Sequence, residues 1–198
     1  MTRHLLIAGA AIAALSLAAC GQPADQSATA PAESVVPDAN PAATIPTPAD
    51  ETAAPDFARL AAQSDMLEIQ SSQLAAERAQ DAEVKSFAQM MVEAHTKTTQ
   101  DLKTAIEASG QAIPLPTSAS EEVMEEVNDL REEDVAEFDK EYIDLQVDTH
   151  QKALNLMQRY AADGDMPGLQ AFAAATAPAI QQHLDQAKAI QDRLANAR

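Results

Sequence analysis

Residues 81–110 read DAEVKSFAQMMVEAHTKTTQDLKTAIEASG. Apolar side chains recur in this stretch at every third or fourth position, the spacing that places them on one face of an α-helix. Gly110 follows the last of them, and glycine commonly ends a helix. The stretch therefore predicts an amphipathic helix over about 81–109 with a histidine on its apolar face. The residues expected on that face are Val84, Phe87, Ala88, Met91, His95, Thr98, Leu102, Ala105 and Ile106.

The same spacing predicts three further helices, over about 55–78, 133–162 and 167–195. The helix over 133–162 is expected to bury both Val135 and Phe138. At 1.5 Å per residue, helices of about 24 to 30 residues measure roughly 36 to 45 Å, which suits a four-helix bundle. No segment shows the alternating pattern of a strand, so the fold class is predicted to be all-α.

The connections between these helices indicate the topology. Short links near Gln80 and Gly164 predict two antiparallel hairpins, whereas the segment between the hairpins, 110–132, is much longer. A long central connection that crosses the length of an antiparallel four-helix bundle is the ferritin-like arrangement, and a plain up-down-up-down order is the alternative. The pattern Ser118-x-x-Glu121 predicts a capped short helix within this connection, with three residues on its apolar face: Val123, Val127 and Leu130.

The N-terminus has the features of a bacterial export signal. Arg3 precedes an uncharged apolar run that ends at Cys20, the only cysteine. The run is short for a membrane span, and Leu17-Ala18-Ala19-Cys20 resembles the lipobox of bacterial lipoproteins. We expect a lipoprotein signal peptide over residues 1–19 and acylation of Cys20. Because Gly21 follows the cysteine instead of an aspartate, the expected location is the outer membrane, facing the periplasm.

Residues 20–54 separate the expected anchor from the helices. They are rich in Pro, Ala, Ser and Thr and contain no aromatic residue, so they cannot form a core and are expected to be a disordered tether. The chain is therefore divided into a signal peptide (1–19), a lipidated linker (20–54) and a helical bundle (55–198). The formal net charge of −18 argues against nucleic acid as a partner.

Polar residues on the apolar helix faces are the candidates for chemistry. Glu68, His95, His150 and His183 come one from each predicted helix. Glu68 and His95 are 13 and 14 positions from the first turn, and His150 and His183 are about 14 and 19 positions from the second, so all four can meet near one level of the core. On a helical projection, His95 and His183 lie within their apolar faces and His150 lies at an edge.

Two interpretations of this cluster are open on the sequence alone. Neutral imidazoles with one carboxylate are ligands for a divalent transition metal such as Zn, Cu or Fe, and Glu68, His95, His150 and His183 are then the metal residues. Alternatively, each histidine is a core residue that binds no metal and is hydrogen-bonded to a nearby side chain. The partners expected in that case are Glu68, Thr98, Thr149 and Thr176.

The sequence argues against the common enzymes of this architecture. Di-iron carboxylate sites need a Glu-x-x-His pair on each of two helices, but Val92, Val147 and Ile180 stand three positions before the histidines. The nucleophile elbow of hydrolases and the glycine-rich phosphate loops are absent from the sequence. We therefore expect a protein that is not an enzyme. An oxidase with a nonstandard metal site would require redox turnover with iron or copper.

Several stretches of the chain carry a family likeness: Glu68-Ile69, Leu74-Ala75, VKSFAQMMVEAHT at 84–96, FDKEY at 138–142, His150-Gln151, Ala177-Pro178 and His183-Leu184. With these, residues 56–194 resemble the DUF4142 family, a ferritin-like group of exported bacterial proteins. The resemblance implies a ferritin-like bundle and points to Glu68 and the three histidines, but it implies no activity. The chain has Ala94 where the family has an acidic residue, and it lacks the family's pair of glycines near Asp65.

The expected function is that of an envelope-anchored lipoprotein whose helical domain binds a transition metal in its core and acts in envelope or stress maintenance. The alternative is a metal-free interaction module that presents the acidic segment 121–141 to a basic protein partner. Salt-sensitive association without metal would distinguish this module. The one partner that the sequence predicts is the membrane, which the protein is expected to contact through the lipid on Cys20.

Overall fold

The computed structural model describes residues 50–197. The predicted signal peptide, the predicted lipidation site Cys20 and nearly all of the predicted linker lie outside the described residues. The described part is all-α and comprises η1 (Asp50–Thr52), α1 (Ala54–Arg78), α2 (Ala82–Ser109), α3 (Glu121–Glu132), α4 (Phe138–Asp163) and α5 (Pro167–Asn196). None of its helices combines the length and the apolar character needed to cross a membrane.

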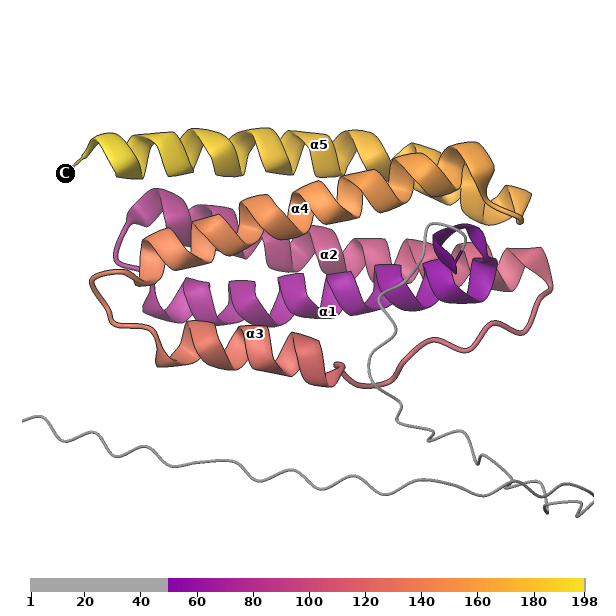
Figure 1. Cartoon of the computed structure of the whole chain (residues 1–198), viewed down its shortest axis with the longest axis horizontal. Helices are drawn as coiled ribbons and strands as arrows, with labels where there is room; N and C mark the ends of the chain where they lie inside the picture. Colours follow the sequence, from indigo (N-terminus) through magenta and orange to yellow (C-terminus); the bar gives the residue numbers. More distant parts are fainter. Residues whose placement is uncertain (1–49, 198) are drawn as a thin grey trace, which may run out of the picture. The chain divides into compact units, whose positions relative to one another are not determined.

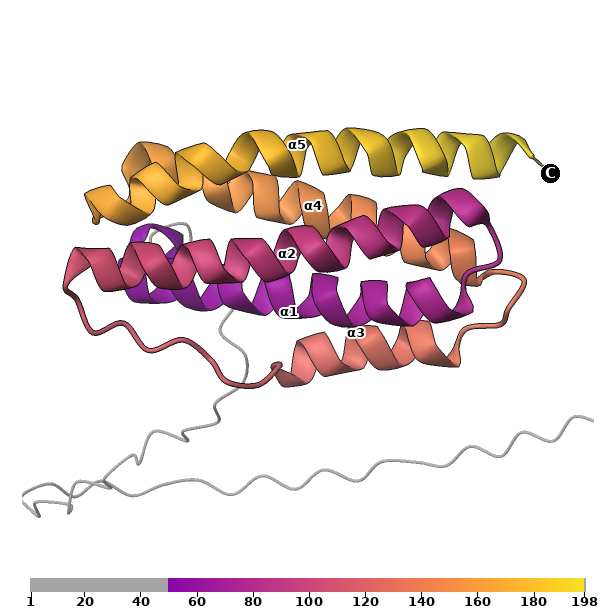
Figure 2. The same cartoon turned by 180° about the vertical axis from the view of Figure 1, so that it is seen from behind.

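The four long helices form a bundle of two antiparallel hairpins, α1–α2 and α4–α5 (Figures 1 and 2). Helix α2 packs against α5, and α1 packs against α4, so the two hairpins lie side by side. Helix α2 ends at one end of the bundle and α4 begins at the other, so the connecting segment 110–137 runs along the whole bundle (Figure 1). This crossing confirms the predicted ferritin-like arrangement and excludes the up-down-up-down order.

Helix α3 lies on the crossing connection and packs against α1, and its three predicted apolar residues are buried. Its N-cap is Ser120, whose hydroxyl accepts a hydrogen bond from the amide of Val123 at 3.2 Å. Gln63 on α1 explains this start, because its side chain donates to the Ser118 carbonyl at 3.0 Å and accepts from the Ser120 amide at 2.8 Å. The prediction that Ser118 is the cap was therefore wrong by two positions.

Helix α4 begins at Phe138 instead of near residue 133 as predicted. The cause is Arg78, whose guanidinium lies 4.5 Å from the centre of the Phe138 ring. The same guanidinium donates to three backbone carbonyls where α3 ends, those of Leu130, Arg131 and Glu133. These contacts hold the chain in a turn between the two helices. Val135 lies in that turn and is 61% exposed, so its predicted burial was wrong.

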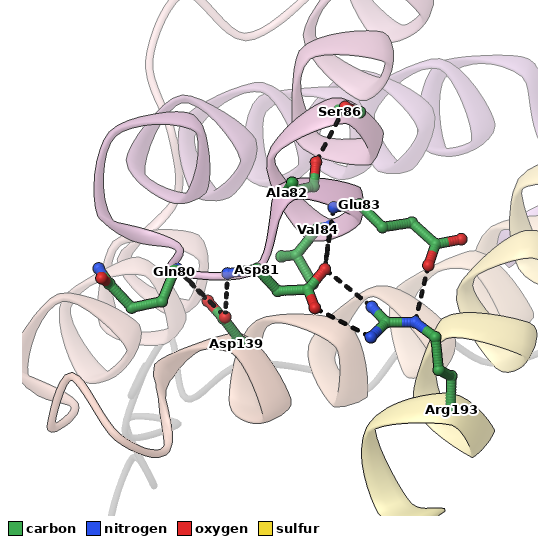
Figure 3. A network of polar contacts seen from close by, with 8 residues as sticks. All are labelled: Gln80, Asp81, Ala82, Glu83, Val84, Ser86, Asp139 and Arg193. Atoms are coloured by element: carbon green, nitrogen blue, oxygen red, sulfur yellow. Dashed lines mark hydrogen bonds and ion pairs between the residues drawn. The ribbon is translucent and has the colours of Figure 1, made fainter. Parts of the chain in front are cut away.

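A polar network around Asp81 joins three helices at one end of the bundle (Figure 3). Asp81 accepts hydrogen bonds from two amides in the first turn of α2, at 2.9 and 3.1 Å, which caps that helix. Arg193 on α5 donates to both Asp81 oxygens, at 2.9 and 2.8 Å, and pairs with Glu83 at 2.7 Å. Asp139 on α4 accepts from the amides of Gln80 and Asp81. The network therefore holds α2, α4 and α5 in a fixed axial register.

The apolar core is divided into two clusters along the bundle. One cluster contains Phe57 and Phe172, and the other contains Phe87 and Phe138. The residues of α1, α2 and α4 that lie between the clusters include eight buried polar side chains: Asp65, Glu68, Ser71, Ser72, His95, Gln146, Thr149 and His150. Burying a polar group without a hydrogen-bond partner lowers the free energy of unfolding. This polar layer is therefore the place to look for a functional site.

Candidate metal centre

Three histidines meet in the polar layer. His95 on α2, His150 on α4 and His183 on α5 have ring centroids 5.4 to 5.9 Å apart. One nitrogen of each ring lies within 4.8 Å of one nitrogen of each of the other two rings. The sequence therefore placed these three residues correctly at one level of the bundle, even though they come from three helices.

The ring of His95 is held by Asp65 on α1. Nδ1 of His95 lies 2.8 Å from one carboxylate oxygen of Asp65, and the other oxygen accepts a hydrogen bond from Thr99 at 2.9 Å. With its Nδ1 proton directed at Asp65, the neutral ring carries its lone pair on Nε2, which is buried and has no partner within residues 50–197. Burial lowers the pKa of His95, but the hydrogen bond to Asp65 and the charge of Glu68 outweigh burial and raise it.

His150 is fully buried, with 0% of its surface exposed, so the prediction that it lies at an edge was wrong. Its Nδ1 lies 2.9 Å from the backbone carbonyl oxygen of Gln146, one turn earlier on α4, and donates to it. Its Nε2 is buried without a partner in the described part of the chain. Burial, together with the nearby charge of His95, lowers the pKa of His150 to about 3. The ring is therefore neutral near pH 7, with a free lone pair on Nε2.

His183 is half-buried and forms the outer side of the cluster. Its Nδ1 is buried and has no hydrogen-bond partner among the described residues. Burial is the main cause that lowers the pKa of His183 to about 4, and the charge of His95 adds to it. His183 also lines a groove between α2 and α5, so it is the histidine of the three that faces both the core and the surface.

Glu68 lies beside the three histidines, but its carboxylate is not among the ligand atoms that lie within 4.8 Å of one another. One of its oxygens is 3.2 Å from Nδ1 of His150, the nitrogen whose proton points to the Gln146 carbonyl. Glu68 is 1% exposed, and neither oxygen has a hydrogen-bond partner within residues 50–197. Burial raises the pKa of Glu68 to about 7. The structure thus places the predicted carboxylate behind His150, on the side away from its free nitrogen.

Two of the four predicted partners, Thr98 and Thr176, do not bind the histidines, whereas Glu68 lies 3.2 Å from Nδ1 of His150 as predicted. The hydroxyls of Thr98 and Thr176 donate to carbonyls of their own helices, those of Ala94 and Phe172. Sequence reasoning missed Asp65, which binds His95. Its signal was present, because Asp65 stands three positions before Glu68 and therefore lies on the same helix face. The family pattern has an acidic residue just before this histidine, where the chain has Ala94. Asp65 nevertheless provides a carboxylate that contacts His95.

The chemical capacity of this arrangement follows from its free nitrogens. His95 Nε2, His150 Nε2 and His183 Nδ1 are all buried without partners in the described residues. Three imidazoles around one point fit a divalent transition metal and leave further coordination positions open. His150 and His183 are neutral because their pKa values are lowered, whereas His95, whose pKa is raised, gives up its Nε2 proton when a metal binds. The contact between Asp65 and His95 is the carboxylate–histidine pairing that orients a metal-binding imidazole and increases its basicity.

Comparison with known families agrees with this architecture. The sequence profile described as domain of unknown function (DUF4142) matches residues 39–190. The chain belongs to the DUF4142 family. The match includes Glu68 and all three histidines of this DUF4142 domain. A search of curated proteins gave no match.

Two solved structures share the fold of this DUF4142 domain. A fragment of a DUF305 protein from Deinococcus radiodurans has a TM-score of 0.60 and 17% identity, covering 71% of this chain and 95% of that one. CopM in its Cu(II)-bound form has a TM-score of 0.60 and 15% identity, covering 72% of this chain and 97% of that one. At these identities the likeness shows a common helical fold.

The metal-free DUF4142 domain should lose stability as the pH falls from about 6.5 to 4. His150 and His183 have pKa values of about 3 and 4 in the fold against 6.5 in an unfolded chain, so acid protonates the unfolded chain first. Glu68 and His95 act in the opposite direction, because their pKa values are raised in the fold, that of Glu68 to about 7, and their contributions decline as the pH rises. Urea unfolding at several pH values should show that the free energy of unfolding decreases less on acidification in His150→Gln than in the parent. A difference between the two proteins that is independent of pH would contradict this assignment.

Proposed function

We propose that this protein is an envelope-anchored lipoprotein whose bundle binds one divalent transition metal ion through His95, His150 and His183. The observation that carries the proposal is the set of three buried imidazole nitrogens without hydrogen-bond partners, within 4.8 Å of one another. Glu68 lies beside the ligands, where a bound cation would favour its charged form, and Asp65 positions His95. The proposed role is binding without catalytic turnover.

The same observation separates metal binding from a purely structural role. A buried polar atom that loses its hydrogen bonds costs about 1–3 kcal/mol, so histidines retained for stability should have both nitrogens partnered. In this site, each histidine instead directs one unpartnered nitrogen into the bundle, and His95 and His150 use their other nitrogen to fix the ring. One bound cation would satisfy all three free nitrogens together.

Zinc, copper and iron all accept imidazole ligands, and the donor set is compatible with each of them. Cu(II) is the first ion to test because CopM, a protein with the same helical fold, has been captured with Cu(II) bound. Anchoring through Cys20 at the outer membrane, with the bundle in the periplasm, would place the site where it meets metal ions that enter the envelope. We propose a role in envelope or stress maintenance on that basis.

Metal titration of the full-length chain tests the proposal. Cys20 is changed to Ser in every sample so that no thiol competes for the metal, and Cu(II) or Zn(II) is added while metal content and thermal unfolding are measured. We expect about one ion per chain and a higher Tm, since a ligand at 100 times its Kd stabilises a fold by about 2.7 kcal/mol. The variant with His95, His150 and His183 changed to Gln should show neither effect.

The matched control is His4→Gln, which removes the remaining histidine of the chain, in the predicted signal peptide. It should bind metal as the parent does. Equal metal binding by the triple variant, or no binding by the parent, would contradict the proposal. In the second case, the alternative of a metal-free interaction module gains support from salt-sensitive association with a basic partner.

A further inference from the structure

A groove between α2 and α5 leads from the surface to the candidate metal centre. Its volume is about 560 Å³, and His183 is one of its lining residues. Most of the other residues that line it are small, among them Ala94, Thr98 and Ala179. Helix α3 packs on α1 and lies away from α5, so it leaves this side of the bundle uncovered (Figures 1 and 2).

The three ligand histidines differ in their access to this groove. His95 and His150 are 3% and 0% exposed, whereas His183 is half-buried and lines the groove. Its Nδ1 nevertheless is buried in the cluster, without a partner in the described residues. A second groove, between α1, α3 and α4, passes near the polar layer at Leu67 and Thr149, but none of the three histidines lines it. Of these two grooves, only the α2–α5 groove is lined by one of the three histidines, and this histidine reaches from the groove into the core.

The helix that carries His183 lacks one backbone hydrogen bond near this residue. Pro178 lies inside α5, one turn and a half before His183, and a proline in a helix removes one backbone hydrogen bond. Small side chains on both walls leave room for the imidazole to swing outward, because Ala179 lies on the same wall and Thr98 on the opposite one. The rim also carries the exposed ion pair of Lys97 and Asp101.

We propose that metal ions enter and leave the three-histidine site through the α2–α5 groove, with His183 as the first ligand to bind and the last to release. This inference rests on the proposed metal-binding function and adds that the site exchanges its ion with ligands in solution. An ion first bound by His183 at the groove reaches the two buried nitrogens when the ring turns inward. Release follows the same steps in reverse, and a soluble chelator can then capture the ion.

Narrowing the groove tests the route without changing a ligand. Ala179→Leu adds a branched side chain at an exposed position that lines the groove, and Ala174→Leu adds the same side chain at an exposed α5 position outside the groove. Both are made in the full-length chain with Cys20→Ser. Stopped-flow mixing with Cu(II), followed by quenching of tyrosine fluorescence, measures uptake, and mixing the loaded chain with EDTA measures release.

We expect Ala179→Leu to slow uptake and release alike, by about tenfold, which corresponds to about 1.4 kcal/mol in the barrier. Its Kd and stoichiometry should match those of the parent, and Ala174→Leu should exchange Cu(II) at the parental rates. Thr98→Leu, on the opposite wall, repeats the test if Ala179→Leu does not fold.

The outcomes separate this route from the function on which it rests. Parental exchange rates in both groove variants, with Cu(II) binding intact, would overturn the route and leave metal binding in place. Equal slowing by Ala174→Leu would also overturn it, because the effect would then not depend on the groove. Absence of Cu(II) and Zn(II) binding in the parent would overturn the proposed function together with this inference.

Discussion

Changing Glu68 and His150 together to Leu should stabilise the metal-free domain by about 1–4 kcal/mol while abolishing metal uptake. Both side chains are almost completely buried, at 1% and 0% exposure, and three of their four polar atoms have no hydrogen-bond partner in the described residues. Leucine is close in size to both residues and adds apolar contacts between the two core clusters. We therefore expect that Glu68 and His150 lower the stability of the metal-free domain and that their role is in metal binding.

Urea unfolding of the metal-free proteins measures this effect, and metal titration of the same samples measures uptake. Gln151→Leu serves as the control, because it places leucine at an exposed position one residue after His150 on the same helix. It should leave both stability and uptake near the parental values. A double variant that is less stable than the parent would show that Glu68 and His150 hold the fold together, and it would contradict the assignment of this layer to binding.

Changing Asp65 to Asn should weaken metal binding by about 10-fold to 100-fold. Asp65 lies 2.8 Å from Nδ1 of His95, so its negative charge keeps the Nδ1 proton in place and leaves Nε2 free for the metal. Asparagine preserves the shape of the side chain but removes the charge. The affinity is measured by competition with a chelator of known Kd, using Cu(II) and the chain with Cys20→Ser.

A second measurement distinguishes positioning of His95 from a general effect on the fold. The bond to Asp65 raises the pKa of His95, so NMR titration of the ring in Asp65→Asn should show a lower pKa than in the parent. The control is Asp56→Asn, also on α1, whose side chain is exposed and pairs with Arg59. It should change neither the affinity nor the His95 pKa. Parental affinity in Asp65→Asn would refute the positioning role.

Much of the fold follows from the sequence because helix formation leaves a local signal. Apolar residues at helical spacing, Gly110 after the second helix and Pro167 at the start of the last predicted most helix boundaries to within a residue or two. The late start of α4 was not predictable in this way. It depends on Arg78, which binds carbonyls more than 50 positions further along the chain.

The candidate site, too, could be predicted only in part from the sequence. Counting positions from the turns placed the three histidines at one level, because each residue advances a helix by a constant 1.5 Å. The burial of His150 and the half-exposure of His183 reversed the prediction from helical projection. Rotation of a helix about its axis depends on what packs around it, and α5 has one side open at the groove whereas α4 lies against both α1 and α5.

By itself, the sequence determined the all-α class, the long crossing connection and the level at which Glu68 and the histidines lie, since periodicity and residue counts record these locally. Only the tertiary structure decided which atoms meet there. It paired His95 with Asp65, set Glu68 behind His150 and directed three free nitrogens to one point. The reason is physical: partners across helices are selected by helix rotation and side-chain packing, which arise from contacts between segments far apart in the chain.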